Sequence, residues 1–343
     1  MKLGRIHRDS PDGKVARLVA AHPDEDRVVD LAAAEQLRLT RAGSTSAAAR
    51  RIAAALFPES MSQAIAAGPA FLDAAERADE AAGRDASLPI ADVEWIAALD
   101  PPVIRDSLTF PLHMKQYGEA LNVGPPNPQF FRTPGYFKGS TGTVFGHDEV
   151  IPYPAFAEKI DYELELGFVV GGEGRNLTPD QAGELLFGLT IFNDFSARDI
   201  QAREMGMGMG PQKCKDFAFG IGPWITTIGD PGLPPLDQLT MRVRVNGEEW
   251  ATGVSEGMIY SAQELLAYVS VGDVLQPGDI IGSGTVGNGS ALELGRHLVP
   301  GDVVELEVDG VGVLRNRFSA EPDQHPWWPE PRENPFETEA AVS

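Results

Sequence analysis

The chain has 343 residues, 43% of them hydrophobic, which is enough length and apolar content for a globular protein with a large core. Its 50 acidic and 28 basic residues give a formal net charge of −22, which argues against nucleic acid or an anionic membrane as a partner because both require a cationic surface. No apolar run has the length of a membrane span, and the polar start MKLGRIHRDSPDG lacks the apolar core of a signal peptide. Cys214 is the only cysteine, so we expect a cytoplasmic protein without an intrachain disulfide.

The N-terminal part of the chain predicts short strands followed by helices. Residues 1–35 contain three strand-like runs, KLGRIHR, KVARLVAAH and DRVVDLAA, which are separated by the turn-rich SPDG and PDED. Residues 44–83 are rich in alanine and predict two helices with a break at Pro58. A double proline at 101–102 follows, so we predict an N-terminal α+β region over residues 1–98.

From residue 103 onward, short β-rich runs alternate with glycine and proline. Thr178 and Ser261 each open a capping-box pattern, TPDQ and SAQE, which predicts the start of a helix. Asn246 with the glycine after it separates MRVRV from EEWATGV, which predicts a tight hairpin. Many short strands and few helices favour an α+β fold that is mostly β. The acidic, proline-rich residues 319–343, which contain a WW pair, predict an extended tail.

Three carboxylates in the middle of the chain are candidate metal ligands. Glu163 and Glu165 are two residues apart in DYELELGFVVGG, so in a strand they share one face while Leu164 takes the other. Asp194 ends the apolar run LLFGLTIFND and could reach the pair from a second strand end. Clustered carboxylates are costly to bury without a cation, and all-oxygen ligands suit Mg²⁺, Mn²⁺ or Ca²⁺. The alternative is that the two glutamates line the solvated face of an amphipathic strand.

The order of several motifs along the chain favours the metal site. DYELELGFVVGG is followed by NDFSARDIQ and then by a lysine just before DFAFGIGPW. This block closely resembles the fumarylacetoacetate hydrolase family, whose signature is an E-x-E strand, an N-D-x-S-A-R-D-x-Q segment and a following lysine. The resemblance covers roughly residues 100–316. It implies a β-roll of mixed sheets as a catalytic domain over residues 99–318, and a homodimer or larger homo-oligomer.

The resemblance implies one divalent cation, Mg²⁺ with Mn²⁺ or Ca²⁺ as alternatives, held by four carboxylates: Asp106, Glu163, Glu165 and Asp194. It also implies a catalytic histidine, His113, seven residues after Asp106. That spacing is weak evidence by itself, because a histidine between Leu112 and Met114 is often structural. Its place just before the shared NVG motif, ahead of the E-x-E strand, favours the catalytic role.

Further polar residues receive roles from the same resemblance. Arg198, Gln201 and Lys215 match the groups that stabilise charge developing on the substrate. Tyr136 and Thr285 match substrate contacts. Glu293 matches the glutamate that accepts a hydrogen bond from the catalytic histidine and so sets its tautomer. Without the resemblance, Arg198 and Gln201 are equally consistent with a salt bridge and a surface amide.

Two departures from the family pattern bear on the reaction. Relatives that act as decarboxylases or isomerases often carry an acid three residues after the histidine, where this chain has Gln116. The tyrosine that lies near the metal aspartate in the family's hydrolase is replaced by Leu108. The first departure favours the hydrolases, and the second indicates a different substrate without affecting the metal site.

These features predict a divalent-metal-dependent hydrolase that cleaves a carbon–carbon bond in a 1,3-diketone acid of the acylpyruvate or fumarylacetoacetate type. His113, oriented by Glu293, activates the water, and the substrate is a small keto acid. The same site used without water would make a 2-oxo acid decarboxylase or a hydroxy-dienoic diacid isomerase, and resemblance of fold does not separate these reactions. A non-catalytic metal-binding scaffold is the remaining alternative, which the near-complete set of polar residues disfavours.

Overall fold

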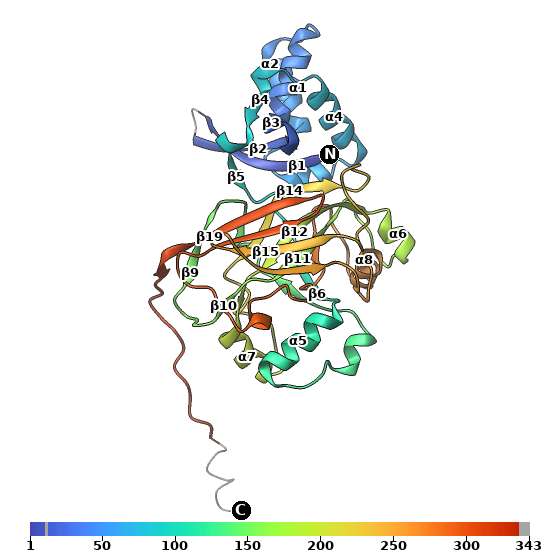
Figure 1. Cartoon of the computed structure of the whole chain (residues 1–343). Helices are drawn as coiled ribbons and strands as arrows, with labels where there is room; N and C mark the ends of the chain where they lie inside the picture. The colour runs from blue at the N-terminus through green and yellow to red at the C-terminus, as the bar shows by residue number, and fades with distance from the viewer. Residues whose placement is uncertain (11–12, 336–343) are drawn as a thin grey trace, which may run out of the picture.

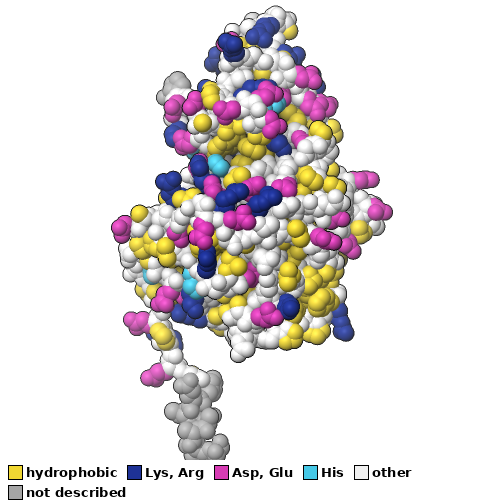
Figure 2. Space-filling view, in the orientation of Figure 1, with side chains coloured by type: hydrophobic (Ala, Val, Ile, Leu, Met, Phe, Trp, Pro, Cys, Tyr) yellow, Lys and Arg dark blue, Asp and Glu magenta, His cyan; other side chains and the backbone are white. Residues whose placement is uncertain are grey.

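The computed structural model describes residues 1–10 and 13–335 (Figure 1). It is 27% helical and 34% strand, which confirms the prediction of a mixed fold with more strand than helix. Within the described residues, no helix combines the length and the apolar character needed to cross a bilayer. On the face drawn in Figure 2, acidic and basic side chains are mixed across the surface.

The N-terminal part contains antiparallel strands with four helices beside them, at the top of Figure 1. Its elements are β1 (Lys2–Ser10), β2 (Gly13–His22), β3 (Arg27–Asp30), α1 (Leu31–Arg41), α2 (Ser46–Leu56), α3 (Met61–Ile65), α4 (Pro69–Glu80), β4 (Ser87–Pro89) and β5 (Glu94–Ile96). The strand predicted for DRVVDLAA stops at Asp30, because the Asp30 side chain accepts a hydrogen bond from the backbone N–H of Ala33 and caps α1. Three helices, and not the two predicted, occupy residues 44–83.

The remaining chain is mostly β. Its elements are β6 (Ile104–Leu108), α5 (Pro111–Leu121), β7 (Gly135–Gly139), β8 (Val144–Phe145), β9 (Val150–Pro154), β10 (Ile160–Asp161), β11 (Leu164–Val170), α6 (Pro179–Gly183), β12 (Leu186–Asp194), β13 (Ser196–Ala197), α7 (Arg198–Gly206), β14 (Phe219–Thr227), β15 (Thr240–Val245), β16 (Glu248–Val254), α8 (Ala262–Ser270), β17 (Ile280–Gly282), β18 (Val303–Val308) and β19 (Gly312–Asp323). Both predicted capping boxes are confirmed, at the starts of α6 and α8. The predicted hairpin is also confirmed, because Asn246 and Gly247 have positive φ between β15 and β16.

Two main sheets organise the molecule. The larger sheet has the order β4-β3-β2-β1-β14-β12-β11-β17-β6-β7, with β5 paired to β1 and β8 paired to β14. The smaller one has the order β16-β15-β18-β19-β9, and a core of apolar side chains fills the space around β11, β12, β15, β18 and α8. Helices α5 and α7 lie together at the end of the molecule opposite the N-terminal helices (Figure 1).

The large sheet runs through the boundary that the sequence predicts near residue 98. Strand β1 pairs antiparallel with β14, in the register of Leu3 opposite Ile225. A second apolar core joins alanines of α1 and α4 to Phe192 of β12 and Phe219 of β14. The N-terminal region is therefore joined to the rest by backbone hydrogen bonds and by a shared core, and its status as a separate unit remains a prediction.

The C-terminal segment leaves the body after β19, which continues to Asp323 and so extends past the predicted start of the tail at residue 319. Residues 324–335 are exposed and without regular structure, and the last eight residues of the predicted tail lie outside the described residues (Figure 1). Trp328 stacks on Phe156 with ring centroids 5.3 Å apart and planes inclined by 6°. This contact anchors the start of the tail on the body.

Candidate active site

The candidate metal ligands come from three strands that lie close together in the large sheet. Asp106 lies in β6, Glu165 in β11 and Asp194 at the end of β12, and β17 separates β6 from β11. Gly282 of β17 pairs with both Asp106 and Gly167, so it lies between the carboxylates. A Cβ atom at Gly282 would clash with Asp106 Oδ1 and Glu165 Oε2. The absence of a side chain at this position lets the two carboxylates meet across the intervening strand.

Asp106, Glu165 and Asp194 form a buried group whose ligand oxygens lie within 4.8 Å of one another. Burial raises the pKa of Asp106, and burial together with the charge of Asp106 raises the pKa of Glu165 well above its usual range. Among the described residues, Asp106 Oδ1 and Asp194 Oδ1 have no hydrogen-bond partner. Buried oxygens without partners and an all-carboxylate donor set fit a hard divalent cation, which would compensate the charge.

Glu163 lies beside this group and contacts two buried cations. Arg198 Nη2 donates to Glu163 Oε1 at 2.8 Å, and the Lys215 ammonium lies between Glu163 and Asp194 and contacts both. Burial favours the neutral acid, but the charges of Arg198 and Lys215 outweigh it and hold the pKa of Glu163 well below its usual range. The structure therefore brings three of the four predicted ligands into one oxygen cluster, with Glu163 at its edge.

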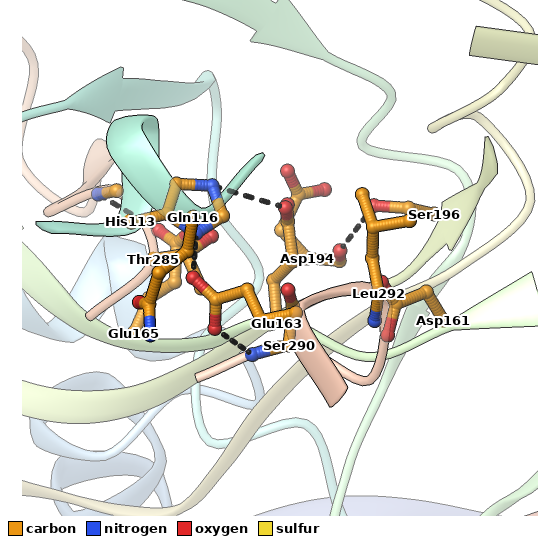
Figure 3. A network of polar contacts seen from close by, with 12 residues as sticks. His113, Gln116, Asp161, Glu163, Glu165, Asp194, Ser196, Thr285, Ser290 and Leu292 are labelled. Carbon is orange, nitrogen blue, oxygen red and sulfur yellow. Dashed lines mark hydrogen bonds and ion pairs between the residues drawn. The ribbon is translucent and has the colours of Figure 1, made fainter. Parts of the chain in front are cut away.

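His113 lies next to the carboxylates (Figure 3). It pairs with Glu293, and both side chains are buried. His113 lies in the first turn of α5, which begins at Pro111. Its Nδ1 is 2.7 Å from Glu293 Oε1, and the other glutamate oxygen accepts from the backbone N–H of Ser290 at 3.1 Å. Because Glu293 accepts from Nδ1–H, Nε2 is left as the basic nitrogen. Nε2 is 3.9 Å from Glu163 Oε1 and thus faces the polar centre of the site.

Asp161 is a site residue that the sequence analysis missed. One of its oxygens accepts from the backbone N–H of Ala291 at 2.7 Å, and the other accepts from Leu292 N–H at 3.2 Å and from Arg198 Nε at 2.7 Å. A single buried carboxylate thus ties Arg198 to the turn that carries Glu293. The sequence does contain a signal for Asp161. It lies two residues before Glu163, so in an extended chain it shares a face with Glu163 and Glu165.

A cavity of about 290 Å³ opens over these groups. The predicted site residues that line it are Asp106, His113, Tyr136, Glu163, Arg198, Gln201, Lys215 and Thr285. The Thr285 hydroxyl donates to Glu165 Oε1 at 3.2 Å, so Thr285 also holds a ligand in place. Gln201 accepts from Arg198 at 2.9 Å. Among the predicted residues that are not in the cavity lining, Glu165 and Asp194 lie below it in the carboxylate cluster, and Glu293 lies behind His113.

The two departures noted in the sequence have structural counterparts. The side chain of Gln116 is bonded to Asn288, because it donates to Asn288 Oδ1 at 2.6 Å and accepts from the Asn288 backbone N–H at 3.1 Å. Leu108 lines the cavity with 39% of its surface exposed.

Cys214 is buried, and burial raises the pKa of its thiol to about 12. This thiol therefore stays protonated in spite of the lysines beside it in the sequence.

Comparison with known proteins identifies the family. A family model described as "Fumarylacetoacetate (FAA) hydrolase C-terminal" matches residues 102–319, which is more than half of the chain. The protein belongs to the fumarylacetoacetate hydrolase family. The mitochondrial oxaloacetate tautomerase FAHD2A of Homo sapiens is 30% identical over 266 residues, which are 76% of this chain and 80% of that relative.

Solved structures of this enzyme family share the fold. The fumarylacetoacetate hydrolase of psychrophilic Exiguobacterium antarcticum superposes with a TM-score of 0.68 at 25% identity, over 94% of this chain and 100% of that chain. The maleylpyruvate hydrolase of Sphingobium sp. SYK-6, solved with manganese(II) ion and pyruvate, superposes with a TM-score of 0.66 at 21% identity, over 93% of this chain and 99% of that chain. These relatives catalyse different reactions, so membership shows an enzyme family and leaves the reaction to the site.

Proposed function

We propose that this family member is a divalent-metal-dependent hydrolase that cleaves the carbon–carbon bond between C3 and C4 of a 2,4-dioxo acid. The observation that carries the proposal is the His113–Glu293 pair, whose free imidazole nitrogen faces a buried cluster of carboxylates. A general base beside a metal site is the arrangement that water activation requires. Pyruvate would be one product, and pyruvate is the ligand named with the Sphingobium relative.

The cation of the proposal is Mg²⁺ or Mn²⁺, held by Asp106, Glu165 and Asp194 with Glu163 as the fourth carboxylate. When bound, it supplies Lewis acidity toward the oxygens of the dioxo acid. The Glu163 role rests on the family resemblance, and Arg198 and Lys215, which contact Glu163, balance its charge.

The chain's own residues would carry the proton transfers. His113 Nε2 takes a proton from water, whose oxygen adds to C4, and Glu293 stabilises the resulting imidazolium through Nδ1–H. Lys215, Arg198 and Gln201 line the same cavity and would stabilise the oxyanion at C4. The C3–C4 bond then breaks, C3 takes the proton held on His113 to complete pyruvate, and the released acid gives its own proton to solvent and leaves as a carboxylate. Tyr136 and Thr285 are the proposed substrate contacts.

Tautomerisation of oxaloacetate is the second candidate, favoured by the name of the human relative. This reaction moves a proton between carbon and oxygen, so it needs the same base and the same cation but no water as reactant. The two candidates differ in whether oxygen from water enters the product.

Turnover in ¹⁸O-labelled water separates these candidates. With an acylpyruvate and Mn²⁺, we expect the carboxylate of the released acid to gain one label, because water adds to the carbonyl before the bond breaks. Mass spectrometry of the acid, with an enzyme-free incubation to correct for exchange, measures the label. Unlabelled products would contradict the hydrolase assignment. Enol–keto interconversion of oxaloacetate without cleavage of any acylpyruvate would assign the protein as a tautomerase instead.

We also propose a homodimer in the cytoplasm, supported by the family resemblance and by the single buried cysteine. Leu112 and Val254 line a surface hollow and are each 50% exposed, which is suited to burial against a second copy. Light scattering at tens of micromolar protein is expected to give about twice the chain mass of 36.8 kDa. A uniform mass of one chain at that concentration would contradict the dimer.

A further inference from the structure

The cavity has a polar floor and an apolar outer wall. The carboxylates at the floor are at most 4% exposed, whereas Leu108, Tyr136 and Met205 on the wall are 39%, 38% and 52% exposed. The other apolar residues that line the cavity are Met114, Tyr117, Gly135, Phe137, Gly210 and Pro211. Because exposure increases from the floor to the wall, the wall lies where the far end of an elongated substrate would pass.

Charge compensation for an anion is confined to the floor. The basic side chains that line the cavity among the described residues are His113, Arg198 and Lys215. Arg198 is engaged by Asp161, Glu163 and Gln201, and Lys215 is engaged by Glu163, Asp194 and Ser196. Among the described residues, no lysine or arginine belongs to the wall, and its side-chain polar groups are the hydroxyls of Tyr117 and Tyr136.

We propose that the outer wall is a subsite for an apolar group, so that the preferred substrates are 2,4-dioxo monocarboxylic acids with an aliphatic or aromatic acyl end. This inference rests on the proposed function and adds the chemical class of the acyl group. A second carboxylate at the far end of the substrate would lose part of its hydration against leucine, methionine and proline, and no cationic side chain would compensate for this loss. An alkyl group in the same place is transferred from water to an apolar surface, which is favourable.

Two isosteric substrates test the subsite in turnover. 7-Methyl-2,4-dioxooctanoate and 2,4-dioxoheptanedioate share the dioxo acid head and the chain length, and they end in an isopropyl group and a carboxylate, respectively. We expect kcat/KM with Mn²⁺ to be about ten- to a hundredfold higher for the isopropyl substrate. Equal values, or a higher value for the diacid, would overturn the apolar subsite.

A charge placed on the wall should reverse the preference. In Met205→Lys the ammonium is expected to raise kcat/KM for the diacid, relative to the isopropyl substrate, by about tenfold or more. Met207→Lys is the matched control, because Met207 follows two residues later, is 68% exposed and is outside the cavity lining. We expect Met207→Lys to keep the wild-type ratio. The same ratio in both variants would show that Met205 does not contact the acyl end and would overturn its place in the subsite.

Binding of inert analogues separates this inference from the proposed reaction. 7-Methyl-2-oxooctanoate and 2-oxoheptanedioate lack the second keto group, so hydrolysis cannot act on them. Calorimetry in the presence of Mn²⁺ is expected to give about tenfold tighter binding of the isopropyl compound. Tighter binding of the isopropyl compound, together with no turnover of any dioxo acid, would support the apolar subsite and contradict the hydrolase assignment. Tighter binding of the diacid, or binding of neither compound, would reject the subsite whatever the reaction.

Discussion

Replacing Glu293 with glutamine is expected to lower kcat by about a hundred- to ten-thousandfold, the usual range for general-base assistance. The carboxylate of Glu293 accepts from His113 Nδ1 at 2.7 Å and stabilises the imidazolium that forms when Nε2 takes a proton. A glutamine amide supports either tautomer and carries no charge, so the base would be weakened and misoriented. Steady-state kinetics with saturating Mn²⁺ measures kcat, and calorimetry measures the cation affinity, which should stay unchanged.

Glu119→Gln is a matched control on the helix that carries His113, because Glu119 has a side chain 66% exposed and forms an ion pair with the exposed Lys115. It removes the same charge from the protein and should leave kcat within about twofold of the wild type. Full activity of Glu293→Gln would contradict the role of the pair. A loss of cation binding in that variant would instead show that Glu293 supports the metal site.

Glu165→Gln is expected to weaken divalent-cation binding by at least about a hundredfold and to abolish turnover. Glu165 is fully buried, is one of the three clustered carboxylates, and is held by the Gly284 N–H at 3.0 Å and by the Thr285 hydroxyl at 3.2 Å. Its loss removes charge and a fixed ligand position together. Calorimetry and elemental analysis of purified protein measure the binding directly.

Thermal unfolding gives an independent measure of the same cation. A cation at a hundredfold excess over Kd stabilises the folded protein by about 2.7 kcal/mol, so Mn²⁺ should raise the Tm of the wild type and EDTA should lower it. Glu165→Gln should lose this response. Glu35→Gln is the control, because Glu35 is also buried but pairs with Arg38 in α1, and its variant should keep the response to Mn²⁺.

The same measurements on Glu163→Gln test the fourth ligand. If four carboxylates hold the cation, Glu163→Gln should weaken cation binding as much as Glu165→Gln does. A wild-type affinity with reduced kcat would assign Glu163 instead to holding Lys215 and Arg198, which it contacts in the structure. A cation-independent Tm and no metal on elemental analysis of the wild type would contradict the metal site itself.

The local features of the fold were predictable because their causes are local. The capping boxes at Thr178 and Ser261 and the Asn246–Gly247 hairpin each depend on hydrogen bonds between residues a few positions apart. The shared face of Glu163 and Glu165 follows from the alternation of side chains along an extended chain. The helix that begins at Leu31 was missed, although its cap is also local, because the run of valine, leucine and alanine around Asp30 fits either state.

The motifs of the family were sufficient to propose a metal site, a histidine–glutamate pair and a β-rich fold, because these depend on residue types in a fixed order. The tertiary structure decided how far-separated segments meet. Gly282 joins Asp106 to Glu165 only through the strand order β6-β17-β11, and Asp161 joins Arg198 to the turn of Glu293 across 130 residues of chain. The pairing of β1 with β14 and the apolar outer wall of the cavity are also contacts between distant segments. Sequence patterns report periodicity within an element, whereas register between strands and the lining of a cavity arise only when the elements pack together.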